Sequence, residues 1–241
     1  MALIRIQKYL SQIGFASRAQ AERYIENGWV KLNGLTLNEV GASFDPDHDK
    51  LSFNSKIKEI QFHYFLYFKP GGIVTVGAQR DEKEIKDIIK LPAGVVPVGR
   101  LDKMSTGLIL LTDDAVVAKR LMMPEFEHEK EYEVQVDRPL STNSLKILST
   151  GVPLFGEKTR PPQLARTSAN SFRIVLTEGK NRQIRRICEA VGYRVSKIHR
   201  TRIETLNIGH LHSGTMRKLS VEEIQTLKNK LKIKPPNMEY F

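Results

Sequence analysis

The first fifty residues carry two helical patterns followed by a strand pattern. Apolar positions recur at helical spacing over residues 6–13, and Ser17 with Gln20 has the spacing of a capping box that begins a second helix. Apolar and polar residues then alternate on both sides of Asn33-Gly34, a pair typical of a two-residue hairpin turn. The order helix, helix, hairpin predicts a small amino-terminal module.

From residue 62 onward the pattern changes to apolar runs that predict buried strands. Residues 62–68 are apolar and aromatic, and Leu108–Leu111 is an apolar run too short for a helix, as expected for central strands. Alternation over 128–136 and the apolar segment 172–177 predict two further strands, whereas 81–91 has a helical pattern. Strands with irregularly interspersed helices favour an α+β fold around a mixed, mainly antiparallel sheet.

The change of pattern also predicts the domain organisation. Composition turns polar and charged between the two parts, so we expect a small domain over residues 1–56, a linker over 57–61 and a larger domain over 62–229. Residues 230–241 are basic and contain Pro235-Pro236, which predicts a flexible tail.

The net charge of the chain indicates what kind of partner it binds. The 241 residues carry a net charge of +11 with a pI near 9.7, which indicates a polyanionic partner, nucleic acid before an anionic membrane. The sequence has no apolar run near the ~20 residues of a membrane span and no signal-peptide pattern. Its single cysteine, Cys188, excludes an internal disulfide. We therefore expect a cytoplasmic protein that binds nucleic acid.

The candidate chemistry lies in a polar loop before the buried run at 108–111. This loop carries one carboxylate, Asp102, between Gly99 and Gly107. A loop held by a rigid strand is a common place for catalytic side chains, although an Asp that only caps a turn is the alternative interpretation.

This stretch contains Gly99-Arg100-Leu101-Asp102, then Ser105, Gly107 and the run Leu108–Thr112. These residues resemble the catalytic motif of pseudouridine synthases. They are most similar to the RsuA/RluB/RluE/RluF family, and Ser105, where the family commonly has Thr, is similar to RluF-like members. The resemblance implies that Asp102 is the catalytic residue and that Arg100 occupies the space left by a displaced base or holds a phosphate.

Two further stretches resemble later motifs of the family. Tyr132, within Lys130–Val134, corresponds to a tyrosine that faces the active site, although an ordinary core tyrosine is the alternative. Arg185, within Glu178–Arg186, corresponds to an arginine that pairs with the catalytic Asp, and Ile187 would pack beneath the base. Basic residues dominate from Lys180 to Arg202, which indicates a phosphate surface. The expected substrate contacts are Arg100, Lys180, Arg182, Arg186, Ile187, Arg200 and Arg202.

The amino-terminal module contains Ile6–Leu10, Gly14, Ala16-Ser17-Arg18, Ala21-Glu22, Ile25, Gly28, Val30 and Asn33-Gly34. In these residues it resembles a small RNA-binding domain first recognised in a ribosomal small-subunit protein. The resemblance implies a basic surface over RNA, whereas a merely solvated charged face is the alternative. The residues expected on this surface are Arg5, Lys8, Arg18, Arg23 and Lys31.

Together the resemblances imply a monomeric pseudouridine synthase that isomerises a uridine of large-subunit (23S) ribosomal RNA, with a transfer RNA as a further substrate. The reaction rearranges existing bonds, so no cofactor is expected. No metal is expected either, because His210 and His212 have no neighbouring Cys or acidic residue in the sequence. The competing hypothesis is a non-catalytic RNA-binding or ribosome-assembly factor with the same fold.

Overall fold

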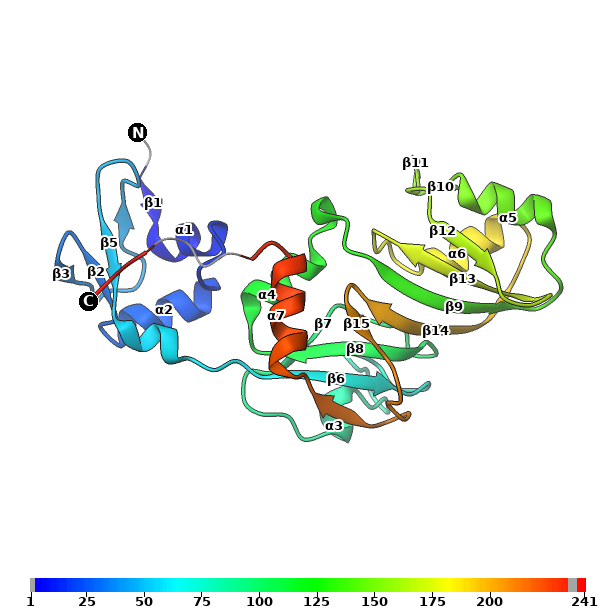
Figure 1. Ribbon diagram of the computed structural model, residues 1–241, viewed down its shortest axis with the longest axis horizontal. Coiled ribbons are helices and arrows are strands. Elements are labelled where there is room, and N and C mark those ends of the chain that lie inside the picture. The colour runs from blue at the N-terminus through cyan, green and yellow to red at the C-terminus, as the bar shows by residue number, and fades with distance from the viewer. Residues whose placement is uncertain (1–2, 234–237) are drawn as a thin grey trace.

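The computed structural model describes residues 3–233 and 238–241 (Figure 1). The amino-terminal module lies at one end of an elongated molecule, and α5 and α6 lie at the other end. The helices are α1 (Ile6–Gln12), α2 (Arg18–Glu26), α3 (Ile85–Ile88), α4 (Ala115–Met122), α5 (Thr142–Ser149), α6 (Gln183–Ala190) and α7 (Val221–Lys230), with 3₁₀ turns η1 (Ser55–Glu59) and η2 (Pro124–Phe126).

The strands form one large sheet and several small ones. The large sheet contains β6 (Tyr64–Lys69), β7 (Val96–Val98), β8 (Thr106–Thr112), β9 (Lys130–Val136), β12 (Gln163–Arg166), β13 (Ser171–Leu176), β14 (Val195–Ile203), β15 (Leu206–Asn207) and β16 (Met216–Lys218). The small sheets contain β1 (Ile4–Arg5), β2 (Val30–Leu32), β3 (Leu35–Thr36), β4 (Ser43–Phe44), β5 (Leu51–Phe53), β10 (Pro153–Leu154), β11 (Glu157–Lys158) and β17 (Glu239–Tyr240).

The amino-terminal module has the predicted order of helix, helix and hairpin. At the start of α2, Gln20 N donates to Ser17 Oγ at 3.1 Å and Ser17 N donates to Gln20 Oε1 at 2.8 Å, which completes the capping box. The β2–β3 turn takes positive φ at Asn33 (51°) and Gly34 (82°), as a type I′ hairpin turn requires. These two local signals are confirmed.

The larger part is built on a sheet of order β12-β13-β9-β14-β8-β6-β16. Within this path β14 and β8 run parallel, and the other neighbouring strands are antiparallel. The predicted α+β fold around a mixed, mainly antiparallel sheet is confirmed.

Strand β8 is buried on both faces of this sheet, as its apolar run predicts. Leu108 and Leu110 are fully buried in a cluster with residues of α4 and α7, whereas Ile109 and Leu111 are fully buried in the cluster on the opposite face. Successive side chains of a strand point to opposite faces. Strand β8 is therefore a rigid element to which the preceding loop is attached.

The helix predicted over 81–91 is shorter in the structure. Asp81 has a left-handed φ of 69°, and the carboxylate of Glu84 accepts hydrogen bonds from Gly77 N (2.6 Å) and Ala78 N (3.1 Å). These local contacts compete with the helix, so only Ile85–Ile88 is helical. Within this short helix Ile85 is fully buried, whereas Ile88 is 42% exposed.

The carboxyl-terminal residues also differ from the expected flexible tail. Leu231 is buried beside α7, and β17 pairs in parallel with β5 of the amino-terminal module. Lys31 Nζ lies 3.9 Å from the centroid of the Phe241 ring, and Lys58 Nζ lies 3.7 Å from that of Tyr240. Without β17, the outer edge of β5 would leave backbone hydrogen-bonding groups unpaired. These groups and the two cation–π contacts explain why β17 docks on β5. Residues 234–237 of the expected tail lie outside the described residues.

In the described part of the chain, no helix has both the length and the apolar character needed to span a lipid bilayer.

Candidate functional site

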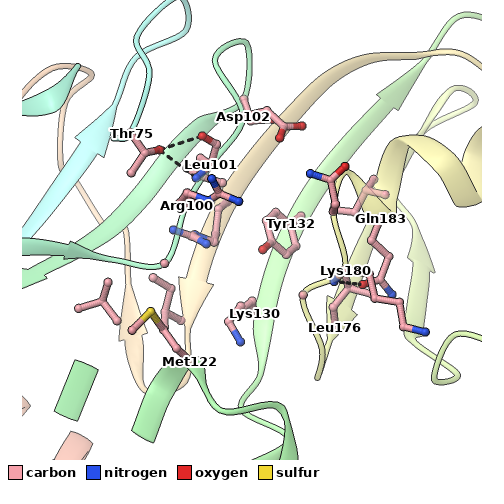
Figure 2. Close-up of a pocket in the computed structure, with 18 of the residues that line it drawn as sticks. Thr75, Arg100, Leu101, Asp102, Met122, Lys130, Tyr132, Leu176, Lys180 and Gln183 are labelled. Carbon is pink, nitrogen blue, oxygen red and sulfur yellow. Dashed lines mark hydrogen bonds between the residues drawn. The ribbon is translucent and has the colours of Figure 1, made fainter. Parts of the chain in front are cut away.

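A cleft of about 690 Å³ lies where the loop before β8 faces α6 and β9 (Figure 2). Its apolar wall includes Met122, Leu176 and Ile184, and its charged lining is mostly basic. Of the residues predicted to form a site, the cleft is lined by Arg100, Asp102, Tyr132, Lys180, Arg182 and Arg200.

Thr75 holds the loop that carries Asp102. Its Oγ1 accepts a hydrogen bond from Leu101 N at 3.0 Å and donates one to Leu101 O at 2.8 Å, and the side chain is buried (Figure 2). Ser105 N donates to Asp102 O at 3.0 Å and closes the turn. The backbone on both sides of the carboxylate is therefore fixed before any substrate binds.

Lys69, at the end of β6, ties the same loop to its neighbour. The side chain is fully buried, and its ammonium donates to Pro70 O (2.8 Å), Ile73 O (2.7 Å) and Lys103 O (3.1 Å). These contacts use all three donors of the ammonium. Burial lowers the pKa of Lys69 to about 8, and nearby Arg200 adds to that shift while the carboxylate of Asp102 opposes it. The local sequence around Lys69 does not predict this role.

Two arginines of the α6 region approach the carboxylate of Asp102. Arg185 Nε lies 3.6 Å and Arg182 Nη1 lies 3.7 Å from Asp102 Oδ2. The Arg185 side chain is 13% exposed and Nη1 donates to Val195 O at 3.1 Å, whereas the Arg182 side chain is 50% exposed. Arg185 is thus held by the protein on both sides, and Arg182 is free to turn toward a ligand.

Tyr132 stands on β9 and faces the cleft (Figure 2). Arg200 of β14 lies beside it, with its guanidinium carbon 6.0 Å from the centroid of the Tyr132 ring. Arg200 is only 3% exposed, and its Nε donates to Leu108 O at 2.6 Å. The expectation that Arg200 faces RNA phosphates must be corrected, because β14 is a central strand and buries this side chain.

Lys130 also lines the cleft, although no role was expected for it from the sequence. It lies two residues before Tyr132 on β9, so the two side chains share a face of the strand. Lys130 Nζ donates to His128 O at 3.0 Å. Burial, helped by the charge of Arg200 and opposed by Glu204, lowers the pKa of Lys130 to about 8. The alternation of residues 128–136 was the signal that could have identified it.

Three predicted contacts lie outside the cleft lining. Ile187 is 1% exposed within the core, and Ile184, one turn earlier on α6, lines the cleft in its place. Arg202 is held by Glu129 (2.9 Å) and Glu131 (3.5 Å) instead of facing solvent. Arg186 packs its guanidinium on the ring of Phe155, outside the cleft lining. The rotation of α6 about its axis places Ile187 and Arg186, and the pairing of β14 with distant strands places Arg202. Neither can be read from the local sequence.

The amino-terminal residues predicted to bind RNA divide into two groups. Arg5, Lys8 and Arg18 line one shallow depression on the surface of the module. Arg23 is exposed near the end of α2, and Lys31 contacts the ring of Phe241. The structure thus brings three of the five cations together.

Among residues 3–233 and 238–241, no cluster of three or more His, Cys, Asp or Glu side chains is arranged to hold a metal ion.

Comparisons with known proteins agree with the geometry. A family model described as RNA pseudouridylate synthase matches residues 63–190, and one described as S4 domain matches residues 4–45. The chain is 37% identical over 225 residues to the dual-specificity RNA pseudouridine synthase RluF of Escherichia coli (strain K12), covering 92% of this chain and 77% of that one. It is 35% identical over 234 residues to the ribosomal large subunit pseudouridine synthase B of Bacillus subtilis (strain 168), covering 93% and 95%. A crystal structure of a pseudouridylate synthase matches with a TM-score of 0.69 and 28% identity, covering 93% and 99%.

Proposed function

Because the chain belongs to the RNA pseudouridylate synthase family, we propose that it isomerises a uridine of large-subunit ribosomal RNA, with Asp102 as its catalytic carboxylate. The observation that carries this proposal is the Asp102 carboxylate at the cleft, 3.6 Å from the buried guanidinium of Arg185. The name of the Bacillus relative supports the large ribosomal subunit as the source of substrate. The dual specificity in the name of the Escherichia relative supports a second RNA, for which we propose a transfer RNA.

The reaction needs only groups that the cleft and the nucleotide supply. The bond between N1 of uracil and C1′ of ribose breaks, and a bond between C5 and C1′ forms. C5 loses a proton and N1 gains one, so the product is an isomer and nothing is oxidised or reduced. Asp102 is the only carboxylate on the fixed loop and acts on this glycosidic system.

The other residues at the cleft bind the nucleotide or position Asp102, each according to where it lies. The target nucleotide leaves its stack at a cost of a few kcal/mol, which basic contacts around the cleft offset. Exposed Arg100 fills the vacated space, and Tyr132 contacts the displaced base. Arg185 fixes the direction of the Asp102 carboxylate, while Lys180 and Arg182 hold phosphates.

We also propose a division of labour along the chain. Residues 1–56 bind RNA through Arg5, Lys8 and Arg18, residues 57–61 form the linker, and residues 62–229 form the catalytic domain. Ile57 and Ile60 of the linker pack against the amino-terminal core, which supports a defined position of that domain. We propose that the protein works as a cytoplasmic monomer.

A product assay tests the proposed function directly. Purified protein is incubated with transcripts of large-subunit ribosomal RNA or transfer RNA that carry tritium at C5 of uridine. Isomerisation releases this tritium to water, and sequencing then locates the modified position. We expect stoichiometric release from one site. Binding of the transcripts without release would favour the non-catalytic RNA-binding or assembly factor instead.

Arg185→Lys tests whether this side chain positions Asp102. Lysine has a single ammonium, so it cannot contact Asp102 and donate to Val195 O with the geometry of a guanidinium. We expect single-turnover rates to fall at least about tenfold, equivalent to roughly 1.4 kcal/mol of barrier. RNA affinity should change less, because Lys180 and Arg182 still line the cleft.

Arg182→Lys is the matched control for this substitution. Arg182 lies at nearly the same distance from Asp102, at 3.7 Å, but its side chain is half exposed. We expect its main effect on affinity and on the slope of log affinity against log salt. If Arg185→Lys instead weakens binding and leaves the turnover rate at saturating RNA unchanged, Arg185 is a phosphate contact and not a positioning residue.

The lowered pKa of Lys130 predicts that RNA affinity depends on pH. Because burial lowers its pKa to about 8, its ammonium predominates below that pH and is lost as the pH rises. A bound phosphate favours the ammonium, so affinity should fall by up to about tenfold between pH 7 and 9. Lys130→Arg keeps its charge over this range and should remove most of the fall. Binding titrations of both proteins in the same buffers check this, and equal slopes would contradict it.

A further inference from the structure

An exposed aromatic ring lies at the tip of the β10–β11 hairpin. Phe155 is 61% exposed and has a left-handed φ of 56°. The base of the hairpin is buried and doubly bonded, because Thr159 N donates to Val152 O and Val152 N donates to Thr159 Oγ1, each at 2.9 Å. The ring therefore stands on a rigid stem and projects into solvent.

One face of this ring is covered by a cation from α6. The guanidinium carbon of Arg186 lies 4.5 Å from the centroid of Phe155. Arg186 forms no ion pair with an acidic side chain of the described residues, and its buried Nε has no hydrogen-bond partner among them. The neighbouring acid, Glu157, is paired with Lys180 at 2.9 Å. The tip thus combines a planar apolar surface with an uncompensated positive charge.

The tip is connected to the cleft along one side of α6. Arg186 N donates to Arg182 O at 3.1 Å, so the two residues are one helical turn apart. Arg182 in turn reaches to 3.7 Å from Asp102, and Lys180, which holds the hairpin through Glu157, lines the cleft. Figure 1 shows the hairpin beside α6 at the end of the molecule opposite the amino-terminal module.

From this geometry we propose that Phe155 and Arg186 form a stacking platform for an unpaired RNA base near the target uridine. The inference rests on the proposed function as an RNA-modifying enzyme. Every base offers a π-face to an aromatic ring, and an adjacent guanidinium adds both stacking and charge. An RNA strand whose target nucleotide occupies the cleft passes Arg182 before it reaches the platform.

Phe155→Trp provides a signal from the platform itself. The chain has one tryptophan, Trp29 in the amino-terminal module, so the difference between the variant and the unsubstituted protein reports position 155 alone. The probe is an unmodified transcript of large-subunit ribosomal RNA. We expect saturable quenching of the added fluorescence, because a base stacks on the indole.

Phe155→Leu separates stacking from simple apolar contact. Leucine keeps the apolar character but has no π-face, so the dissociation constant for the transcript should rise at least about fivefold, whereas Phe155→Trp should remain within about twofold. Ile147→Ala, at a 43% exposed apolar position on α5, is the matched control and should not change affinity. Urea unfolding verifies that each variant is folded.

The outcomes separate this inference from the proposed function. If the transcript binds but is not isomerised, the quenching and the Phe155→Leu loss still support the platform while the proposed function fails. Binding without quenching, or equal affinity of Phe155→Leu and the unsubstituted protein, overturns the platform. A fluorescence change that depends on protein concentration without RNA assigns the ring to contact between two copies of the chain and also overturns it. Absence of any RNA binding overturns both.

Discussion

Replacing Asp102 by Asn should abolish isomerisation and leave the protein folded. The substitution keeps the size of the side chain but removes the charge that acts on the glycosidic system. We expect the turnover rate to fall at least about 10⁴-fold, as for loss of a central catalytic group in other enzymes. Tritium release under single-turnover conditions measures this, with mass spectrometry to exclude conversion of Asn back to Asp.

The surroundings of Asp102 explain why the fold should tolerate this change. The side chain is 33% exposed, and its contacts with Arg182 and Arg185, at 3.6–3.7 Å, are longer than hydrogen bonds. The loop is held by Thr75 and Lys69 through backbone atoms, which the substitution leaves in place. Unfolding in urea should therefore be nearly unchanged.

RNA affinity provides a second, opposite readout for Asp102→Asn. Removing the carboxylate releases two guanidinium groups from an ion pair, so the variant should bind the transcript at least as tightly as the unsubstituted protein. Normal turnover by a variant shown to contain Asn would remove Asp102 from the catalytic role. Loss of both binding and folding would show instead that Asp102 is a structural residue.

The sequence predicted best those features that depend on neighbouring residues. The capping box at Ser17, the turn at Asn33-Gly34 and the buried strand at Leu108–Leu111 each follow from side chains within a few positions. The loop that carries Asp102 could be found for the same reason, because a polar stretch precedes an unmistakable apolar run.

The features that the sequence did not predict depend on long-range register. Strand β14 lies parallel to β8 with Arg200 opposite Gly107, and this pairing buries Arg200. Lys69 is buried because three carbonyl groups, one of them on the loop of Asp102, converge on its ammonium. The docking of β17 on β5 joins the carboxyl-terminal residues to the amino-terminal module. No window of local sequence contains both partners of such contacts, so periodicity alone cannot reveal them.

Gly107 lies on β8, between β6 and β14. Of the substitutions considered, Gly107→Ala should have the largest effect on the free energy of unfolding. Gly107 is opposite Lys69 of β6 on one side and Arg200 of β14 on the other, directly after the loop of Asp102. Its φ of 108° is one that L-residues rarely adopt. An added Cβ would lie 2.6 Å from Arg200 N and would also overlap the carbonyl oxygen of Arg200.

Neither obstacle can move at low cost, because both atoms belong to the backbone of a central strand. We expect Gly107→Ala to lower the free energy of unfolding by at least about 3 kcal/mol, combining backbone strain with overpacking. Gly214→Ala is the matched control: its φ is 79°, but an added Cβ meets nothing within 4 Å. That variant should cost only about 1 kcal/mol.

The comparison of these two variants isolates the close approach of β8 and β14 from the positive φ. Urea unfolding of both proteins measures the difference in stability, and single-turnover isomerisation measures its consequence for the loop. Because the extra methyl group pushes β14 away from β8, Arg200 and the loop of Asp102 should both shift, and residual folded Gly107→Ala protein should turn over slowly. Equal stabilities of the two variants would show that β14 does not pack against β8 at Gly107, and the buried position of Arg200 beside Tyr132 would then have to be abandoned.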